Sequence, residues 1–239
     1  MATSVKTEAV VLRKLRYSEA DSILHLYTKE FGRVNAIAKG TRRSSSRFGG
    51  RLEPLFRVEL MLHEGKGDLA TVTGASTVDG YSAIRTTHAA MSQAASACDA
   101  VLRLLDLREQ NEPAYNLLCN FLAQLNANAS GTSKSVGLAF RLKLLLVAGF
   151  APELGSCASC GSDDGLVGFS ASAGGAICED CLDVGFRCGE AVIVFMRAAL
   201  AQPLASAPEA DVDALRVVDR AINEMAAHHA NVQLRTIAV

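Results

Sequence analysis

The sequence predicts an α+β protein of several domains: an N-terminal five-stranded OB-fold β-barrel, then an α-helical domain with an inserted four-cysteine zinc segment. Three observations favour this class. Short runs rich in Val, Ile and Leu fill the first part of the chain, apolar residues at helical spacing fill most of the rest, and two Cys-x-x-Cys pairs interrupt the helical part. We therefore expect the barrel at 1–80 and the helical domain at 81–239, with the four-cysteine segment at 152–188.

Five short strands are expected in the N-terminal part. In the fourth, Val58, Leu60 and Leu62 lie on one face and Arg57, Glu59 and Met61 on the other, as in a strand buried on one face. Phe31-Gly32 marks a turn between the second and third strands. The predicted strands are Glu8–Arg13, Ser22–Tyr27, Arg33–Ala38, Arg57–His63 and Asp68–Val78. A small closed barrel of this size is commonly an OB-fold, and an SH3-like barrel is the structural alternative.

The connection between the third and fourth strands is strongly basic. Residues 39–51 read Lys-Gly-Thr-Arg-Arg-Ser-Ser-Ser-Arg-Phe-Gly-Gly-Arg, without an acid and without a Walker motif. Arg and Lys neutralise phosphates without reading sequence, so the segment predicts a sequence-tolerant nucleic-acid contact; a solvated loop is the alternative. We expect Phe48 to be exposed for base stacking. The candidate DNA-binding residues are Arg33, Lys39, Arg42, Arg43, Arg47 and Arg51.

The charge balance supports this assignment. Residues 1–80 hold 13 Lys/Arg and 9 Asp/Glu, a balance of +4, out of 24 and 25 in the whole chain. Residues 81–239 therefore hold 11 and 16, a balance of −5. This asymmetry suggests an anionic partner for the N-terminal part and argues against a broad DNA surface on the helical domain.

Five helices are expected after residue 81. Pro113 stands at a first helical position, and the helix that ends before Gly149 is apolar on most faces, so it should lie inside a bundle. Cys98 and Cys119 fall on helices and are expected to be buried. The predicted helices are Met91–Leu107, Pro113–Leu125, Ser135–Ala148, Glu190–Ala201 and Val212–Ala230.

The metal candidates are Cys157, Cys160, Cys178 and Cys181. Seventeen residues separate the two Cys-x-x-Cys pairs, which fits a four-thiolate zinc site, with Gly174-Gly175 as the expected hairpin tip. Four protein ligands leave no open position on Zn²⁺, so the site should be structural rather than catalytic. The alternatives are a redox dithiol, an iron–sulfur cluster or unrelated core cysteines, and Cys188 is a substitute ligand.

Compartment signals favour the cytoplasm. Seven cysteines, four of them in a metal pattern, indicate a reducing compartment rather than a disulfide framework. Met1 to Tyr17 carry charges throughout and lack the apolar stretch of a signal peptide. The longest apolar run, Leu144 to Ala151, is far shorter than a membrane span needs.

With these features placed, the chain resembles the RecO family of bacterial recombination mediators over most of its length. The resemblance lies in five segments: Glu19-Ala-Asp21 with the strand after it, residues 38–54, Gly67–Thr71, Phe140-Arg-Leu-Lys-Leu-Leu-Leu-Val-Ala-Gly-Phe-Ala-Pro-Glu-Leu154, and Gly174-Gly-Ala-Ile-Cys-Glu-Asp-Cys181. The order of basic loop, apolar helix and cysteines is more specific than each motif alone.

The resemblance implies a non-enzymatic role in recombinational repair. Such proteins bind single- and double-stranded DNA, anneal complementary strands, and with RecR help load RecA on DNA coated by single-stranded-DNA-binding protein (SSB). It implies that Cys157, Cys160, Cys178 and Cys181 hold Zn²⁺ and that the helical domain contacts the SSB C-terminal tail, with Arg141 or Lys143 as rim candidates. An RNA- or ribosome-associated module is the alternative; a zinc deaminase is disfavoured because its H-x-E … P-C-x-x-C signature is absent.

Overall fold

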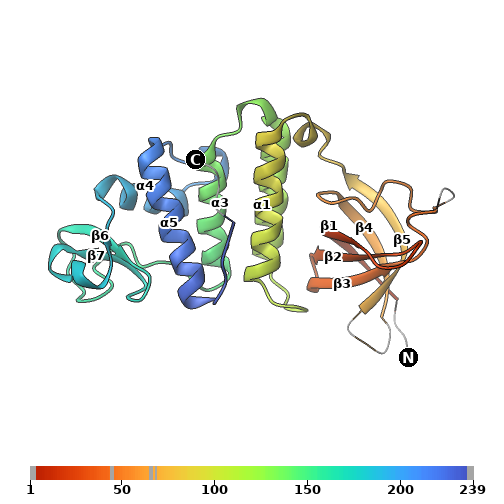
Figure 1. Cartoon of the computed structure of the whole chain (residues 1–239), viewed down its shortest axis with the longest axis horizontal. Coiled ribbons are helices and arrows are strands. Elements are labelled where there is room, and N and C mark those ends of the chain that lie inside the picture. The colour runs from red at the N-terminus through yellow and green to blue at the C-terminus, as the bar shows by residue number, and fades with distance from the viewer. Residues whose placement is uncertain (1–3, 44–45, 65–66, 68, 236–239) are drawn as a thin grey trace. The chain divides into compact units, whose positions relative to one another are not determined.

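A computed structural model describes residues 4–43, 46–64, 67 and 69–235. The chain divides into two compact units, Met1–Ser130 and Gly131–Val239, and each is described by itself. The first unit holds the barrel and also the first two long helices (Figure 1). The expected boundary at residue 80 separates strands from helices, whereas the packing division falls after the second helix. Within the described residues no helix has the length and apolar character to cross a membrane.

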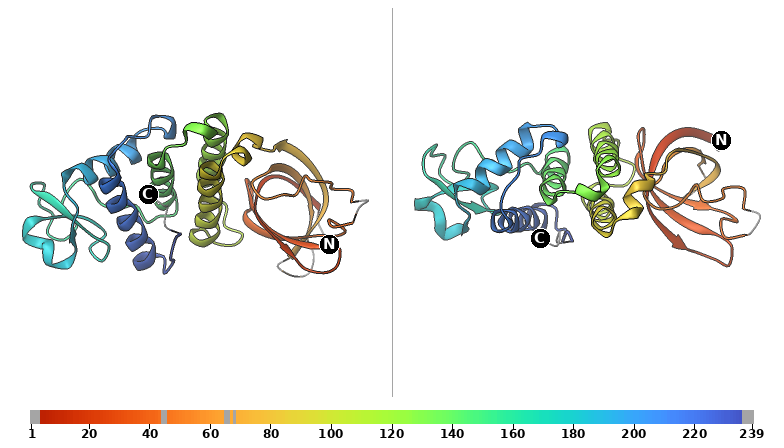
Figure 2. Two further views of the ribbon diagram at one scale, coloured as in Figure 1. Left: turned by 45° about the horizontal axis from the view of Figure 1, so that its top comes forward. Right: turned by 90° about the horizontal axis from the view of Figure 1, so that it is seen from above.

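The barrel is the predicted OB-fold. Its strands follow the closed order β1-β2-β3-β5-β4, and the ring can be followed in the left view of Figure 2. All neighbours are antiparallel except β3 and β5. The strands are β1 (Ser4–Arg16), β2 (Ser22–Thr28), β3 (Gly32–Ala38), β4 (Arg57–His63) and β5 (Leu69–Asp79). Asp68, the expected start of β5, lies outside the described residues.

β1 is longer than the sequence predicted because it serves two neighbours. Its first half pairs with β4 and its second half with β2, and the two pairings overlap at Ala9 and Val10. Residues Ala9 to Leu12 are buried on both faces of the strand, whereas its ends carry polar residues such as Lys6 and Lys14, so the apolar signal is confined to the middle. Gly32 starts β3 with φ +61°, and a Cβ there would lie 1.8 Å from the carbonyl oxygen of Glu109, which requires glycine.

Two helices of the first unit pack on the barrel. α1 (His88–Leu104) begins at Thr87, whose side chain accepts a hydrogen bond from the N–H of Ala90. α2 (Glu112–Ala127) begins in the same way at Asn111. Cys98 and Cys119 are buried as predicted, and burial raises the pKa of Cys98 to about 12.

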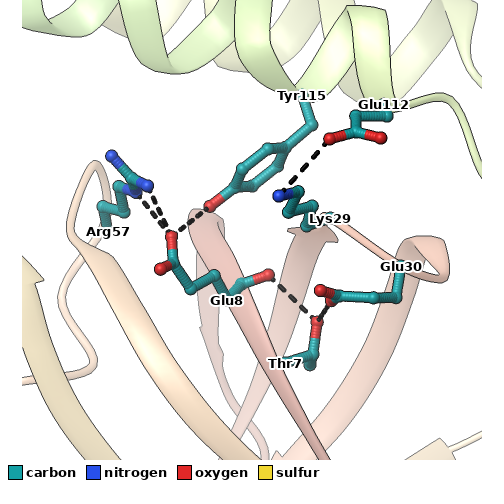
Figure 3. A network of polar contacts seen from close by, with 7 residues as sticks. All are labelled: Thr7, Glu8, Lys29, Glu30, Arg57, Glu112 and Tyr115. Carbon is teal, nitrogen blue, oxygen red and sulfur yellow. Dashed lines mark hydrogen bonds and ion pairs between the residues drawn. The ribbon is translucent and has the colours of Figure 1, made fainter.

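A polar network joins α2 to the barrel (Figure 3). Glu8 on β1 accepts a hydrogen bond of 2.9 Å from Nε of Arg57 and one of 3.2 Å from the hydroxyl of Tyr115. Lys29 forms an ion pair of 3.3 Å with Glu112 at the first turn of α2. The hydrogen bonds from Arg57 outweigh partial burial and lower the pKa of the Glu8 carboxyl from its ordinary value of 4.5.

The second unit is a three-helix bundle with a small sheet attached. Its helices are α3 (Lys134–Val147), α4 (Glu190–Ala201) and α5 (Val212–His229). α3 contacts both other helices, in agreement with its nearly all-apolar sequence. The sheet has the order β7-β6-β8 and consists of β6 (Leu166–Ser170), β7 (Gly175–Cys178) and β8 (Phe186–Arg187). Gly174, at the tip of the β6–β7 hairpin, has φ +91°.

Candidate nucleic-acid interface and metal centre

The basic loop, residues 39–51, is folded against the barrel rather than extended into solvent. It consists of consecutive turns after β3, and two of its apolar side chains, Phe48 and Leu52, are 2% and 1% exposed within the barrel core. The expectation that Phe48 is exposed is therefore wrong. Packing in the barrel core removes the apolar surface of this ring from water, and the guanidinium of Arg47 lies over the ring at 4.7 Å.

Five basic side chains of this loop are exposed: Lys39, Arg42, Arg43, Arg47 and Arg51. Among the described residues none of the five forms a salt bridge with an acid. Lys39 and Arg43 have no side-chain hydrogen bond there, whereas the others donate to nearby carbonyl oxygens. The positive charge of the loop is thus not neutralised by an acid of the described residues. Ser44 and Ser45 lie outside the described residues.

Asp21 fixes the base of the loop. Its carboxylate accepts a hydrogen bond of 2.8 Å from the backbone N–H of Gly40 and so is committed to the backbone rather than to an arginine. The backbone N–H of Arg42 donates to the carbonyl oxygen of Ala20 at 3.0 Å, and Ser22 and Thr41 share a hydroxyl contact of 2.8 Å. The sequence analysis did not predict this role for Asp21. The available signal was an Asp immediately before a predicted strand, because Asp side chains often accept hydrogen bonds from backbone N–H groups in turns.

Arg33 does not join the loop residues. It lies on β3, and its guanidinium donates a hydrogen bond to the carbonyl oxygen of Leu102 on α1. It therefore belongs to the contact between the barrel and α1.

The structure brings the four cysteines together. Their sulfur atoms all lie within 4.8 Å of one another, and Sγ of Cys160 is 3.7 Å from Sγ of Cys178. Zn–S bonds of about 2.3 Å in a tetrahedron place sulfurs about 3.8 Å apart, so the donor set fits a four-thiolate zinc ion. Cys188 lies outside this cluster, and burial raises its pKa to about 11.

Local turns aim the sulfurs at one point. The first pair lies in a turn closed by a hydrogen bond of 2.8 Å from the N–H of Gly161 to the carbonyl oxygen of Cys157. The second pair spans the end of β7 and the start of a 3₁₀ helix, Glu179–Val184. The N–H of Cys178 donates to Sγ of Cys157 at 3.3 Å, a contact that favours a thiolate there.

Neither rim candidate on α3 is a free surface cation. Arg141 is 1% exposed and forms an ion pair with Asp219 of α5, while it donates a hydrogen bond of 2.9 Å to Asn223. The suggestion that Arg141 rims a groove is therefore wrong, because a guanidinium inside a bundle must be paired. Nζ of Lys143 donates to the carbonyl oxygen of Leu200 at 2.8 Å. His228 and His229 are exposed at the end of α5.

Comparisons with known proteins match both parts of the chain. The family model described as Recombination protein O N terminal matches residues 1–81, and Recombination protein O C terminal matches residues 85–235. A DNA repair protein RecO from Rubrobacter xylanophilus is 39% identical over 178 residues, which cover 74% of this chain and 71% of that protein. The protein of the same name from Myxococcus xanthus is 34% identical, with coverage of 78% and 75%.

Proposed function

The chain belongs to the recombination protein O (RecO) family, and we propose that it is a non-enzymatic, DNA-binding mediator of recombinational repair. It binds single- and double-stranded DNA, anneals complementary strands, and with RecR helps to load RecA onto DNA coated by SSB. The observation that carries the DNA contact is the loop of five exposed basic side chains without an acidic partner in the described chain. Its place of action is the nucleoid within the cytoplasm.

The loop suits binding to the phosphate backbone. Lys and Arg neutralise phosphates and release their counterions, a term that does not depend on base sequence. Phe48 is committed to the barrel core, so base stacking at the loop contributes little, and we expect similar affinity for different sequences. Annealing follows from the same chemistry, because neutralised strands repel each other less and can approach closely enough to pair.

The cysteine cluster has a structural role in this proposal. Cys157, Cys160, Cys178 and Cys181 would hold one Zn²⁺, which supplies folding energy to a segment with little core of its own. A four-thiolate ion offers no open position for water or substrate, which supports a role without catalysis. Contact with the SSB tail through the helical domain remains part of the proposal, without Arg141.

The test is strand annealing with a charge variant of the loop. Deleting residues 38–51 would also remove Phe48 from the barrel core, so substitutions are the cleaner perturbation. The double variant Lys39→Gln/Arg43→Gln removes two side chains without hydrogen bonds in the described structure. Its matched control is Lys6→Gln/Arg108→Gln, which removes two exposed charges elsewhere in the same unit.

We expect the loop variant to bind DNA more weakly and to anneal SSB-coated complementary strands more slowly, whereas the control behaves as the parent protein. Equal annealing by all three proteins would refute the assignment of the loop. A parent protein that binds no DNA, or that binds RNA in strong preference to single-stranded DNA, would refute the proposed function itself.

A further inference from the structure

A second cationic site lies in the first unit, between the outer face of the barrel and α1. It is a pocket of about 240 Å³ that is lined by strands β1 to β3 and by the last turns of α1. Three arginines, Arg13, Arg33 and Arg103, line it together with Asp99, and the pair His25 and Asn35 forms its floor with a contact of 2.7 Å. The predicted DNA-binding loop contributes no residue to this lining.

The charges in the pocket do not balance. Asp99 accepts from Nε of Arg103 at 2.7 Å and from Nη2 of Arg13 at 3.5 Å, and Arg33 forms no ion pair in the described chain. Three guanidinium groups against one carboxylate leave two formal positive charges among the lining residues. The carboxylate is 7% exposed, while the side chains of Arg13 and Arg103 are 45% and 44% exposed, so solvent and solutes can reach the cations.

Arg33 also has an unsatisfied donor. Nη1 is engaged by the carbonyl oxygen of Leu102, but Nε is buried and has no hydrogen-bond partner. A buried N–H without an acceptor costs roughly 1–3 kcal/mol relative to a paired one. An anion that enters the pocket could supply the missing acceptor oxygen.

We propose that this pocket binds a phosphate group that carries two negative charges, either inorganic phosphate or a phosphate monoester. The charge of such a group matches the excess of two, and its several oxygens suit donors that approach from two strands and a helix. Each of the three arginines makes one hydrogen bond in the described structure, so most of its five N–H donors remain available. The pocket volume of about 240 Å³ is below the roughly 300 Å³ at which pockets for drug-sized ligands begin, so a single phosphate group fits the pocket better than a whole cofactor.

The monoester could be a free nucleotide or the phosphorylated end of a DNA strand. A DNA end as the source of the phosphate rests on the proposed function, and the fold is compatible with a DNA end at this place. Asn35 in the pocket lies four residues before Lys39, about 13 Å along β3 at roughly 3.3 Å per residue. In the pocket, Arg13 pairs with His25 and His25 with Asn35 across strands β1 to β3. The neighbouring pairs on the same face, Leu15 with Ile23 and Ile23 with Ile37, lie toward the loop and offer bases an apolar surface.

Titration of the full-length protein with inorganic phosphate, followed by calorimetry, tests the pocket without DNA. We expect saturable binding that Arg103→Gln weakens by about tenfold, the loss of one charge-assisted hydrogen bond. Arg13→Gln should act in the same direction, and Arg108→Gln, an exposed arginine that pairs with Glu64 outside the pocket, should have no effect. Absent binding at millimolar phosphate, or equal binding by all variants, would overturn the proposal.

A second set of titrations separates the two sources. Oligonucleotides with a 5′-phosphate, a 3′-phosphate or only hydroxyl ends are compared with a nucleoside monophosphate and its nucleoside. Preference for a phosphorylated strand end that Arg103→Gln abolishes and Lys39→Gln/Arg43→Gln retains supports a DNA-end site. Binding of the monophosphate without any end preference supports a nucleotide site. If DNA binding fails altogether, the proposed function fails while the phosphate titration still decides the pocket.

Discussion

Salt dependence is the quantitative signature of the loop. If Lys39, Arg42, Arg43, Arg47 and Arg51 each neutralise one phosphate of single-stranded DNA, log K falls with log salt with a slope of about −3.5, five contacts at about 0.7 each. Arg33 is left out because its guanidinium is engaged by α1. Between about 50 and 200 mM salt this slope corresponds to a loss of about 100-fold in affinity.

The variant Lys39→Gln/Arg43→Gln should lower the slope to about −2.1, which reduces the loss over the same range to about 20-fold. The measurement is fluorescence anisotropy of a labelled oligonucleotide at several salt concentrations, repeated with a second base sequence. The control Lys6→Gln/Arg108→Gln has the same net charge as the loop variant, so it separates a local contact from a general charge effect. A control slope that falls as far as that of the loop variant would refute the reasoning, as would a parent slope near zero.

Three further outcomes are expected. Chelation of zinc, or Cys160→Ser, should increase hydrogen exchange in residues 152–188 and leave exchange in the barrel unchanged; uniform exchange would contradict a structural metal. Glu8→Gln should cost at most about 1 kcal/mol of unfolding free energy at neutral pH, because both partners are partly exposed. Since the pKa of Glu8 is lowered in the folded state, this cost should disappear as the pH falls below 4.5, and a constant cost in urea denaturation would exclude the ion pair. Arg141→Met should cost about 3–5 kcal/mol by leaving Asp219 buried and unpaired, while Arg141→Met/Asp219→Leu should recover most of it; an unrecovered double variant would contradict this explanation.

The predictions that were confirmed rest on patterns among residues close together in the sequence. The alternation in Arg57–His63 and the helix Glu190–Ala201 match the observed elements to the residue, and the cysteine spacing identified the cluster. These signals depend on near neighbours: strand alternation on successive residues, helical periodicity on a few turns, and thiolate convergence on two tight turns joined by a hairpin.

The side-chain contacts that the sequence did not indicate have partners distant in sequence. Phe48 is buried because its loop packs this ring into the barrel core. No periodicity within the loop indicates that contact. Arg33 is engaged by Leu102, 69 residues later. Arg141 was the most predictable of the three, because a lone arginine on an apolar helix needs an acid, and Asp219 lies on the apolar face of α5 between Leu215 and Ile222.

The double pairing of β1 has a consequence for biosynthesis. β1 leaves the ribosome first, but its second neighbour, β4, follows only at Arg57–His63, and Tyr115 contacts Glu8 from 107 residues away. Such distant contacts delay folding, so the early part of the nascent chain holds an unpaired strand edge for an extended time. Lys6, on the part of β1 that pairs with β4, places a charge along that edge, a known deterrent to pairing with another chain. The polar ends that shortened the predicted strand to Glu8–Arg13 thus include a charge that disfavours pairing with another chain before β4 is made.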